Sequence, residues 1–169
     1  MNTHSGVRLS AMLLAAFAGA VAILVTVASR PAHAATSTAA TVDLGKSTLG
    51  HMLVTSRGRT LYLYEKDKNG RSTCTGTCAT YWPPLLTTAK PHAGTGVRAS
   101  LLGTTRRSDG KLQVTYKRHP LYTFALDKRA GQTKGEGLDD FGAEWYAVSA
   151  AGSKIDKDDS GGGGYGYGG

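Results

Sequence analysis

The two cysteines are the residues of this chain best suited to redox chemistry or metal binding, and three residues separate them. Cys74 and Cys78 are the only cysteines among 169 residues. Their spacing differs from that of redox Cys-x-x-Cys pairs, and neither thiol adjoins a lysine or histidine that would lower its pKa. In an oxidising compartment such a pair favours a mutual disulfide, which we predict here. A redox pair is the alternative.

Histidines are the other candidate metal ligands. His51, His92 and His119 form no close pair, so they could bind copper or zinc with the cysteines only if the fold gathers them. The chain also lacks a nucleophile elbow, a phosphate loop and a dinucleotide-binding fingerprint. The sequence therefore gives no positive evidence for catalysis, and we expect no cofactor and no metal.

Aromatic residues followed by an aspartate occur twice. Residues 61–67 read LYLYEKD, and residues 121–127, sixty positions later, read LYTFALD. Residues two apart share one face of a strand, and aspartate followed by glycine favours a turn. Each copy therefore predicts an aromatic strand with a turn-capping aspartate, and a ligand-binding tyrosine–aspartate pair is the alternative. The candidate binding residues are Tyr62, Tyr64, Asp67, Trp82, Tyr122, Phe124, Asp127 and Trp145.

The same duplication predicts the fold class. Val54-Thr55 corresponds to Val114-Thr115, and two copies of one unit are expected to close on each other as a single domain. Glycine turns at residues 56–58 and 108–110 predict hairpins. We therefore predict a mainly β fold, in which two pseudo-equivalent antiparallel β repeats close into one small domain with short helical turns. The repeats are expected at residues 43–90 and 98–152.

The tandem Y-x-[FWY]-x-x-D signature is accompanied by other distinctive pieces. These are CTGTCATYWPP at residues 74–84, Pro120-Leu121-Tyr122, and Gly135-x-Gly137 followed by Trp145-Tyr146. With these motifs the chain resembles a bacterial family described as predicted lipoproteins, or secreted repeats of unknown function, over roughly residues 43–152. The resemblance implies an exported protein and no biochemical activity, because none is established for the family. A lipobox requires a cysteine at the cleavage site, whereas the first cysteine here is Cys74.

The first residues of the chain predict export, and the last residues predict a disordered tail. Residues 1–34 resemble a signal peptide, because residues 9–28 are almost wholly apolar and Ala32-His33-Ala34 offers a cleavage site. The apolar run is long enough to span a bilayer, so an uncleaved anchor is the alternative. Either reading places the protein outside the cytoplasm, secreted or in the cell envelope. Residues 35–42 predict a flexible spacer, and the glycine- and tyrosine-rich residues 156–169 predict a disordered tail.

The chain is basic. Its formal net charge is +8, and removing residues 1–34 removes two arginines and no acidic residue, which leaves +6. Such a field favours anionic partners, which for an exported protein are envelope polymers or a lipid surface, and we expect no nucleic acid. A solvated face that keeps the protein soluble is the simpler interpretation. Basic residues crowd the second repeat at Arg106, Arg107, Lys111, Lys117, Arg118, Lys128 and Arg129.

These patterns together predict an exported cell-envelope or secreted protein of unknown biochemical activity. We interpret it as a non-enzymatic binding or structural module. The alternative is an envelope redox or metal-binding protein that uses Cys74 and Cys78.

Overall fold

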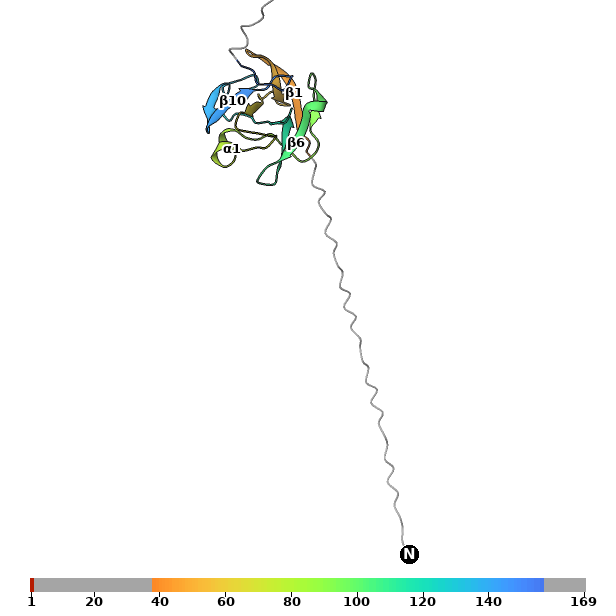
Figure 1. The fold of residues 1–169 in the computed structure, drawn as a ribbon. Helices are drawn as coiled ribbons and strands as arrows, with labels where there is room; N and C mark the ends of the chain where they lie inside the picture. The colour runs from red at the N-terminus through yellow and green to blue at the C-terminus, as the bar shows by residue number, and fades with distance from the viewer. Residues whose placement is uncertain (2–37, 157–169) are drawn as a thin grey trace, which may run out of the picture. The chain divides into compact units, whose positions relative to one another are not determined.

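The computed structural model describes Met1 and residues 38–156 of the chain (Figure 1). The predictions for the signal peptide or anchor and for residues 157–169 of the tail lie outside the described residues. Among the described residues, no helix has the length and hydrophobicity that crossing a membrane requires.

The strands of residues 38–156 form three small sheets (Figure 1). Their orders are β2-β1-β5, β3-β10-β9 and β4-β7-β6, with β8 paired to β7, and every pairing except β1 with β5 is antiparallel. The prediction of a mainly β domain of two repeats is confirmed. The elements are β1 Thr41–Ser47, β2 Gly50–Thr55, β3 Tyr62–Tyr64, α1 Thr77–Tyr81, β4 Leu86–Thr87, β5 His92–Ala93, η1 Ala99–Leu101, β6 Leu102–Arg106, β7 Leu112–Tyr116, β8 His119–Pro120, β9 Leu138–Asp140 and β10 Ala143–Ala147.

Two strands lie where the sequence pattern does not predict them. Strand β1 begins at Thr41, inside the segment 35–42 interpreted as a spacer, and buries Val42 completely in the core. Strand β9 lies in the glycine-rich stretch between the second aromatic motif and Trp145, and pairs with β10. Both strands are set by tertiary pairing rather than by their own composition, which explains why local pattern did not reveal them.

Tyr62 and Tyr122 join the two repeats. The N–H of Tyr62 donates to the carbonyl of Tyr122 at 2.8 Å, and the N–H of Tyr122 donates to the carbonyl of Tyr62 at 3.0 Å. This mutual pair is the same when viewed from either tyrosine. It therefore marks an approximate two-fold axis that relates the first repeat to the second.

Other backbone hydrogen bonds recur in both repeats. The N–H of Leu53 donates to Val148 at 2.7 Å, and the N–H of Val114 donates to Leu85 at 2.8 Å. Val114 therefore corresponds to Leu53 rather than to Val54, one residue away from the sixty-residue offset. The first repeat has one more residue in its hairpin turn, and this insertion shifts the register.

The aromatic motif is a regular strand in only one of the repeats. Tyr62–Tyr64 forms β3 and pairs with β10, whereas the equivalent segment of the second repeat makes only two isolated bridges, both at Tyr122. The chain beside that segment contains Pro83 and Pro84, which have no backbone N–H to donate to a ladder. The carbonyl of Pro83 still accepts from the N–H of Thr123 at 2.9 Å. The two aromatic motifs thus occupy equivalent places in the fold, but only the first forms a regular β-strand.

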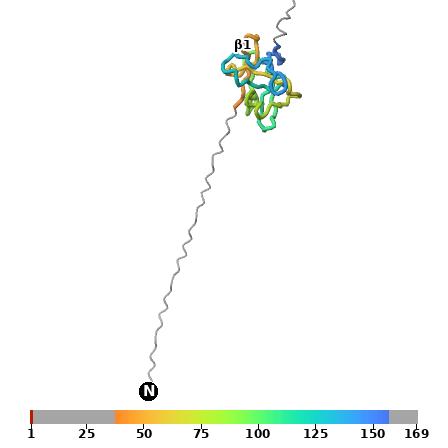
Figure 2. Tube along the Cα trace, turned by 90° about the vertical axis from the view of Figure 1, so that its left-hand side faces the viewer, coloured from red at the N-terminus to blue at the C-terminus, as the bar shows by residue number. Residues whose placement is uncertain are grey.

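Two buried clusters make up the core. One contains the aromatic motif residues and both cysteines. The other is mostly aliphatic and runs from Val42 in β1 to Val148 after β10. Figure 2 shows the first strands of the domain beside its last segment, where Met52 and Ser149 form an isolated bridge. The ends of the domain therefore close against each other across a shared core.

Candidate functional site

Four aromatic rings from both repeats form one buried stack. The rings of Trp82 and Trp145 are parallel within 5°, with centroids 4.0 Å apart. Tyr64 stacks on the outer face of Trp145 at 4.0 Å, and Phe124 stacks on Trp82 at 4.2 Å. Each tryptophan therefore packs on the motif aromatic of the other repeat, and neither repeat completes this core alone.

The remaining two motif tyrosines stand edge-on against the stack. Tyr62 meets Trp82 with centroids 5.4 Å apart and planes 82° apart, and Tyr122 meets Trp145 at 5.1 Å and 86°. Edge-to-face contacts are favoured by the aromatic quadrupole. Gly135 lies against this corner, where an added Cβ would stand 2.7 Å from the Trp82 ring and 3.0 Å from the Tyr62 ring. The glycine of the Gly135-x-Gly137 motif is therefore required by packing.

Each edge-on tyrosine donates a hydrogen bond from its hydroxyl to the aspartate of the other repeat. The Tyr62 hydroxyl donates to Asp127 Oδ2 at 2.6 Å, and the Tyr122 hydroxyl donates to Asp67 Oδ2 at 2.6 Å. We name these two reciprocal bonds the tyrosine–aspartate clasp. Burial, followed by the adjacent carboxylate, raises the pKa of both phenols above the ordinary value. Burial also raises the pKa of Asp67, against the hydrogen bonds from Tyr122 and Thr73.

The second carboxylate oxygen of each aspartate holds a loop. Asp67 Oδ1 accepts from the N–H of Thr73 at 2.7 Å, and Asp127 Oδ1 accepts from the N–H of Lys134 at 2.9 Å. These donors lie six and seven residues beyond the aspartates, rather than two as the turn pattern suggests. All eight candidate binding residues thus lie in one buried cluster, where the aspartates bind protein groups.

The cysteines form a disulfide, as predicted, with their Cα atoms 5.3 Å apart. The bond lies in the same buried cluster as Trp82, which donates its backbone N–H to the Cys78 carbonyl at 2.8 Å. Both sulfurs are used in the bond, which leaves neither as a thiolate to bind a metal or attack a disulfide.

A buried arginine, which sequence reasoning had placed on a solvated basic face, supports the disulfide loop. Arg107 is 5% exposed, and its guanidinium donates to the Cys74 carbonyl at 2.8 Å and to Gln113 Oε1 at 2.8 Å. Arginine is almost never buried unless it is paired, so residue type alone predicted exposure. The adjacent Arg106 is exposed.

The described histidines form no metal-binding group with the cysteines. Residues 38–156 contain no group of three or more His, Cys, Asp or Glu side chains that could hold a metal ion. His51 and His92 are exposed, and His119 is partly buried beside the β7–β8 turn. Burial lowers the pKa of His119 below its ordinary value.

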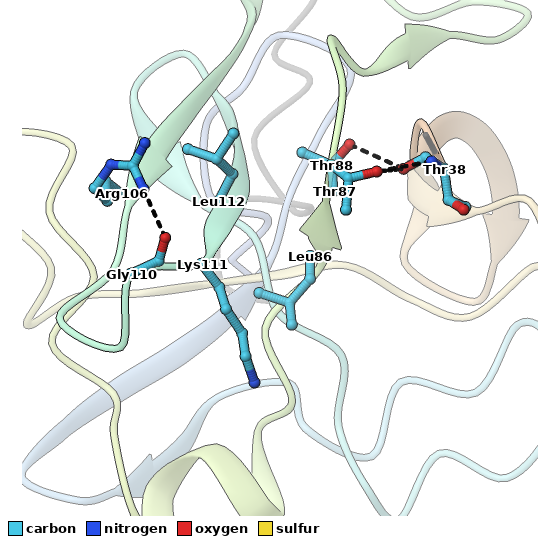
Figure 3. Close-up of a pocket in the computed structure, with 8 residues that line it drawn as sticks. All are labelled: Thr38, Leu86, Thr87, Thr88, Arg106, Gly110, Lys111 and Leu112. Atoms are coloured by element: carbon cyan, nitrogen blue, oxygen red, sulfur yellow. Dashed lines mark hydrogen bonds between the residues drawn. The ribbon is translucent and has the colours of Figure 1, made fainter. Parts of the chain in front are cut away.

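An open groove lies between β4 and the β6–β7 hairpin (Figure 3). Its volume is about 510 Å³, and Leu86, 40% exposed, projects beside it. Arg106 and Lys111 come from the hairpin side, and Thr38 comes from the chain that leads into the domain (Figure 3). The groove is lined by Thr38, Leu86, Thr87, Thr88, Arg106, Gly110, Lys111 and Leu112.

A second hollow of about 340 Å³ shares Leu112 with the groove and is also lined by Lys90, Pro91 and Leu102. The side chains that line the two hollows include three basic residues and no acidic residue among those described. The surface around the two hollows therefore combines apolar side chains with basic side chains. Sequence reasoning missed it, because nothing in a two-residue strand such as β4 indicates which leucine stays exposed.

The comparisons with known proteins agree with the duplicated fold. The family model described as a secreted repeat of unknown function matches residues 44–86 and 103–149, which together are more than half of the chain. No curated protein and no solved structure matches the chain. Each matched segment carries one aromatic motif, and each bond of the tyrosine–aspartate clasp joins one segment to the other. The chain belongs to this family of secreted repeats of unknown function.

Proposed function

We propose that this exported domain is a non-enzymatic binding module that docks on an anionic lipid surface through the groove. The observation that carries the proposal is one face on which an exposed leucine lies among basic side chains, beside the point where the chain joins the domain. The aromatic motif supplies the scaffold, because its side chains are buried and its carboxylates are engaged.

Charge favours a negatively charged surface at this face. Lys90, Arg106 and Lys111 are exposed around the two hollows. A basic side chain close to an anionic membrane contributes about 1 kcal/mol. Three such residues contribute about 3 kcal/mol, roughly a hundredfold in binding. Because exposed charges are screened by salt, binding should weaken as ionic strength rises.

Leu86 favours lipid over a purely polar polymer. Full burial of a leucine side chain contributes about 1.5–3 kcal/mol, and Leu86 holds 40% of its surface open to solvent. A headgroup–acyl boundary can cover that surface with hydrocarbon, whereas a hydrated wall polymer cannot. The contribution of Leu86 therefore separates these two anionic partners.

The position of Thr38 fits a surface close to the membrane. Thr38 lines the groove and follows the apolar run of residues 9–28 by ten positions. Ten residues span at most about 35 Å when fully extended. If the apolar run stays in the membrane, the groove stays within that reach of the headgroups. A cleaved form would depend on the groove alone for docking.

Vesicle flotation of the full chain tests the proposal. A triple variant Lys90→Gln, Arg106→Gln, Lys111→Gln should lower binding to anionic vesicles by about a hundredfold and should leave any binding to neutral vesicles unchanged. The matched control is Arg57→Gln, Lys128→Gln, Arg129→Gln, which makes the same charge change at exposed positions outside both hollows. Every variant keeps the same leader, so any difference between them reports on the domain.

A second pair of variants distinguishes lipid from polymer. Leu86→Asn should weaken binding to anionic vesicles, whereas Leu126→Asn, at a position 52% exposed outside the groove, should not. Equal losses in the two charge variants would contradict the groove as the docking face. A loss with the charge variant but none with Leu86→Asn, together with binding to a soluble anionic wall polymer, would replace lipid with polymer as the partner.

A further inference from the structure

The buried aromatic cluster carries an inference that is independent of the groove. We propose that Trp82, Trp145 and the two clasped tyrosines form a one-electron relay, which receives an oxidising equivalent at the tryptophan pair and holds it as a tyrosyl radical at Tyr62 or Tyr122. In an exported protein this relay would intercept diffusible radical oxidants.

The tryptophan pair is arranged to lose an electron readily. The two indole rings overlap face to face at 4.0 Å, and Tyr64 and Phe124 extend the stack on either side. A positive charge shared between two parallel rings is more stable than the same charge on one ring. Both indole rings are fully buried, so an oxidant at the surface takes the electron by tunnelling and not by direct contact.

The clasp supplies the proton acceptors that a tyrosine needs. Oxidation makes a phenol strongly acidic, and each phenol already donates to a carboxylate oxygen at 2.6 Å. Burial and the carboxylate also raise the pKa of both phenols, so neither loses its proton before it loses an electron. The electron and the proton therefore leave the tyrosine together, the electron to a tryptophan and the proton to an aspartate.

A radical oxidant takes one electron from the tryptophan pair and becomes its closed-shell anion, which leaves a tryptophan radical cation. Tyr62 then gives an electron to Trp82 while its O–H bond breaks and the proton moves to Asp127. The products are neutral tryptophan, a tyrosyl radical and a protonated aspartate. A small thiol or phenol reductant returns one electron, releases its own proton to solvent and becomes a neutral radical, while the proton on Asp127 restores the phenol. The same steps apply to the second arm of the relay, which consists of Trp145, Tyr122 and Asp67.

Packing alone does not account for the two hydroxyls and two carboxylates. Within the stack the repeats use tyrosine and phenylalanine at equivalent places, Tyr64 and Phe124, so a plain ring suffices there. Both edge-on positions instead carry a tyrosine bonded to a carboxylate. Asp127 is fully buried, and among the described residues no ion pair includes either clasp aspartate. Replacing both partners of a buried hydrogen bond by apolar groups of the same shape can be neutral or stabilising, so the two bonds favour a use beyond packing.

Pulse radiolysis with azide radical, which oxidises indole, tests the relay in the full chain. The tryptophan radical should decay as the tyrosyl radical appears, in a first-order step whose rate does not depend on protein concentration. Tyr62→Phe leaves one arm and should keep the step. Adding Asp67→Asn removes the base of that remaining arm and should slow the step by about a hundredfold or more. The control is Tyr81→Phe, which removes a tyrosine 49% exposed outside the clasp and should change nothing.

An unchanged rate in Tyr62→Phe, Asp67→Asn would overturn the relay, and so would a tyrosyl signal lost only with Tyr81→Phe. A second measurement needs no variant. In deuterium oxide the wild-type step should slow, because a proton moves with the electron, and an equal rate in the two solvents would also overturn it. Circular dichroism of each variant establishes that the compared proteins are folded.

Discussion

The Tyr62 hydroxyl donates a hydrogen bond to Asp127, which follows it by 65 residues, and not to Asp67, the aspartate of its own motif. In the same way, the Tyr122 hydroxyl donates a hydrogen bond to Asp67, the aspartate of the first repeat. A signature that reads as a local unit along the sequence is therefore completed only when two copies face each other. This explains in physical terms why the signature occurs in tandem within one domain.

The two arms of the clasp should respond differently to loss of a carboxylate. In Asp127→Asn, whichever way the amide is turned, either Tyr62 or the N–H of Lys134 loses its acceptor, because Asn offers only one oxygen. An unsatisfied buried donor costs about 1–3 kcal/mol. In Asp67→Asn the Tyr122 hydroxyl can still donate to Ser72 Oγ, 2.8 Å away, so the loss should be smaller. Urea denaturation measures both.

The Ala variants at the same positions provide the comparison. Asp67→Ala and Asp127→Ala remove both oxygens and should each destabilise more than the matching Asn variant. Equal, negligible effects from Asn and Ala at both positions would contradict a structural role for the clasp and would favour aspartates that bind a ligand.

The stability of the protein should depend on pH through Asp67. Burial raises the pKa of this carboxyl above its ordinary value of 3.8, so the folded state holds the proton more tightly than the unfolded state does. The stabilising contribution of Asp67 is therefore complete below that ordinary value and is lost as pH rises through the raised pKa. Between about pH 4 and about pH 7, Asp67→Asn should gain stability relative to the wild type. Urea titrations at both pH values test this, and a wild-type advantage over Asp67→Asn that stays the same or grows with rising pH would contradict it.

How far the sequence predicts this molecule depends on how local each feature is. The duplication, the mainly β class and the Cys74–Cys78 bond follow from spacing and residue type. The hydrogen bond between Tyr62 and Asp127 does not follow from the sequence. Asp67 lies five residues from Tyr62, and local pattern assigns each aspartate to a turn in its own repeat. Strand β1 has few strand-forming residues apart from Val42 and depends on pairing with β2. The exposed Leu86 depends on which neighbours leave it uncovered, and that is set by the whole fold.

The adjacent residues Arg106 and Arg107 should differ sharply on replacement. Arg107→Met leaves buried acceptors, including the Cys74 carbonyl, without their donor, and each orphaned acceptor costs about 1–3 kcal/mol. Arg106→Met changes an exposed side chain and should alter the free energy of unfolding by no more than about 0.5 kcal/mol. Chemical denaturation of the two variants compares the same substitution in two environments. Similar effects at both positions would contradict the role assigned to Arg107.

Loss of the disulfide should weaken both repeats together. The Cys74–Cys78 loop is short, and the chain-entropy relation gives about 2 kcal/mol for closing it. Its effect is not confined to the first repeat, because Trp82, in the same cluster, stacks on Trp145 of the second. In the double variant Cys74→Ser, Cys78→Ser we expect a single unfolding transition, shifted to lower urea. Tryptophan fluorescence and far-ultraviolet circular dichroism should give coincident midpoints, as cooperative unfolding requires. Wild-type protein in reductant is the control, because it loses the disulfide without gaining serine side chains. Two separated transitions would mean that the second repeat stays folded without the first, and the shared stack would then not hold the domain together.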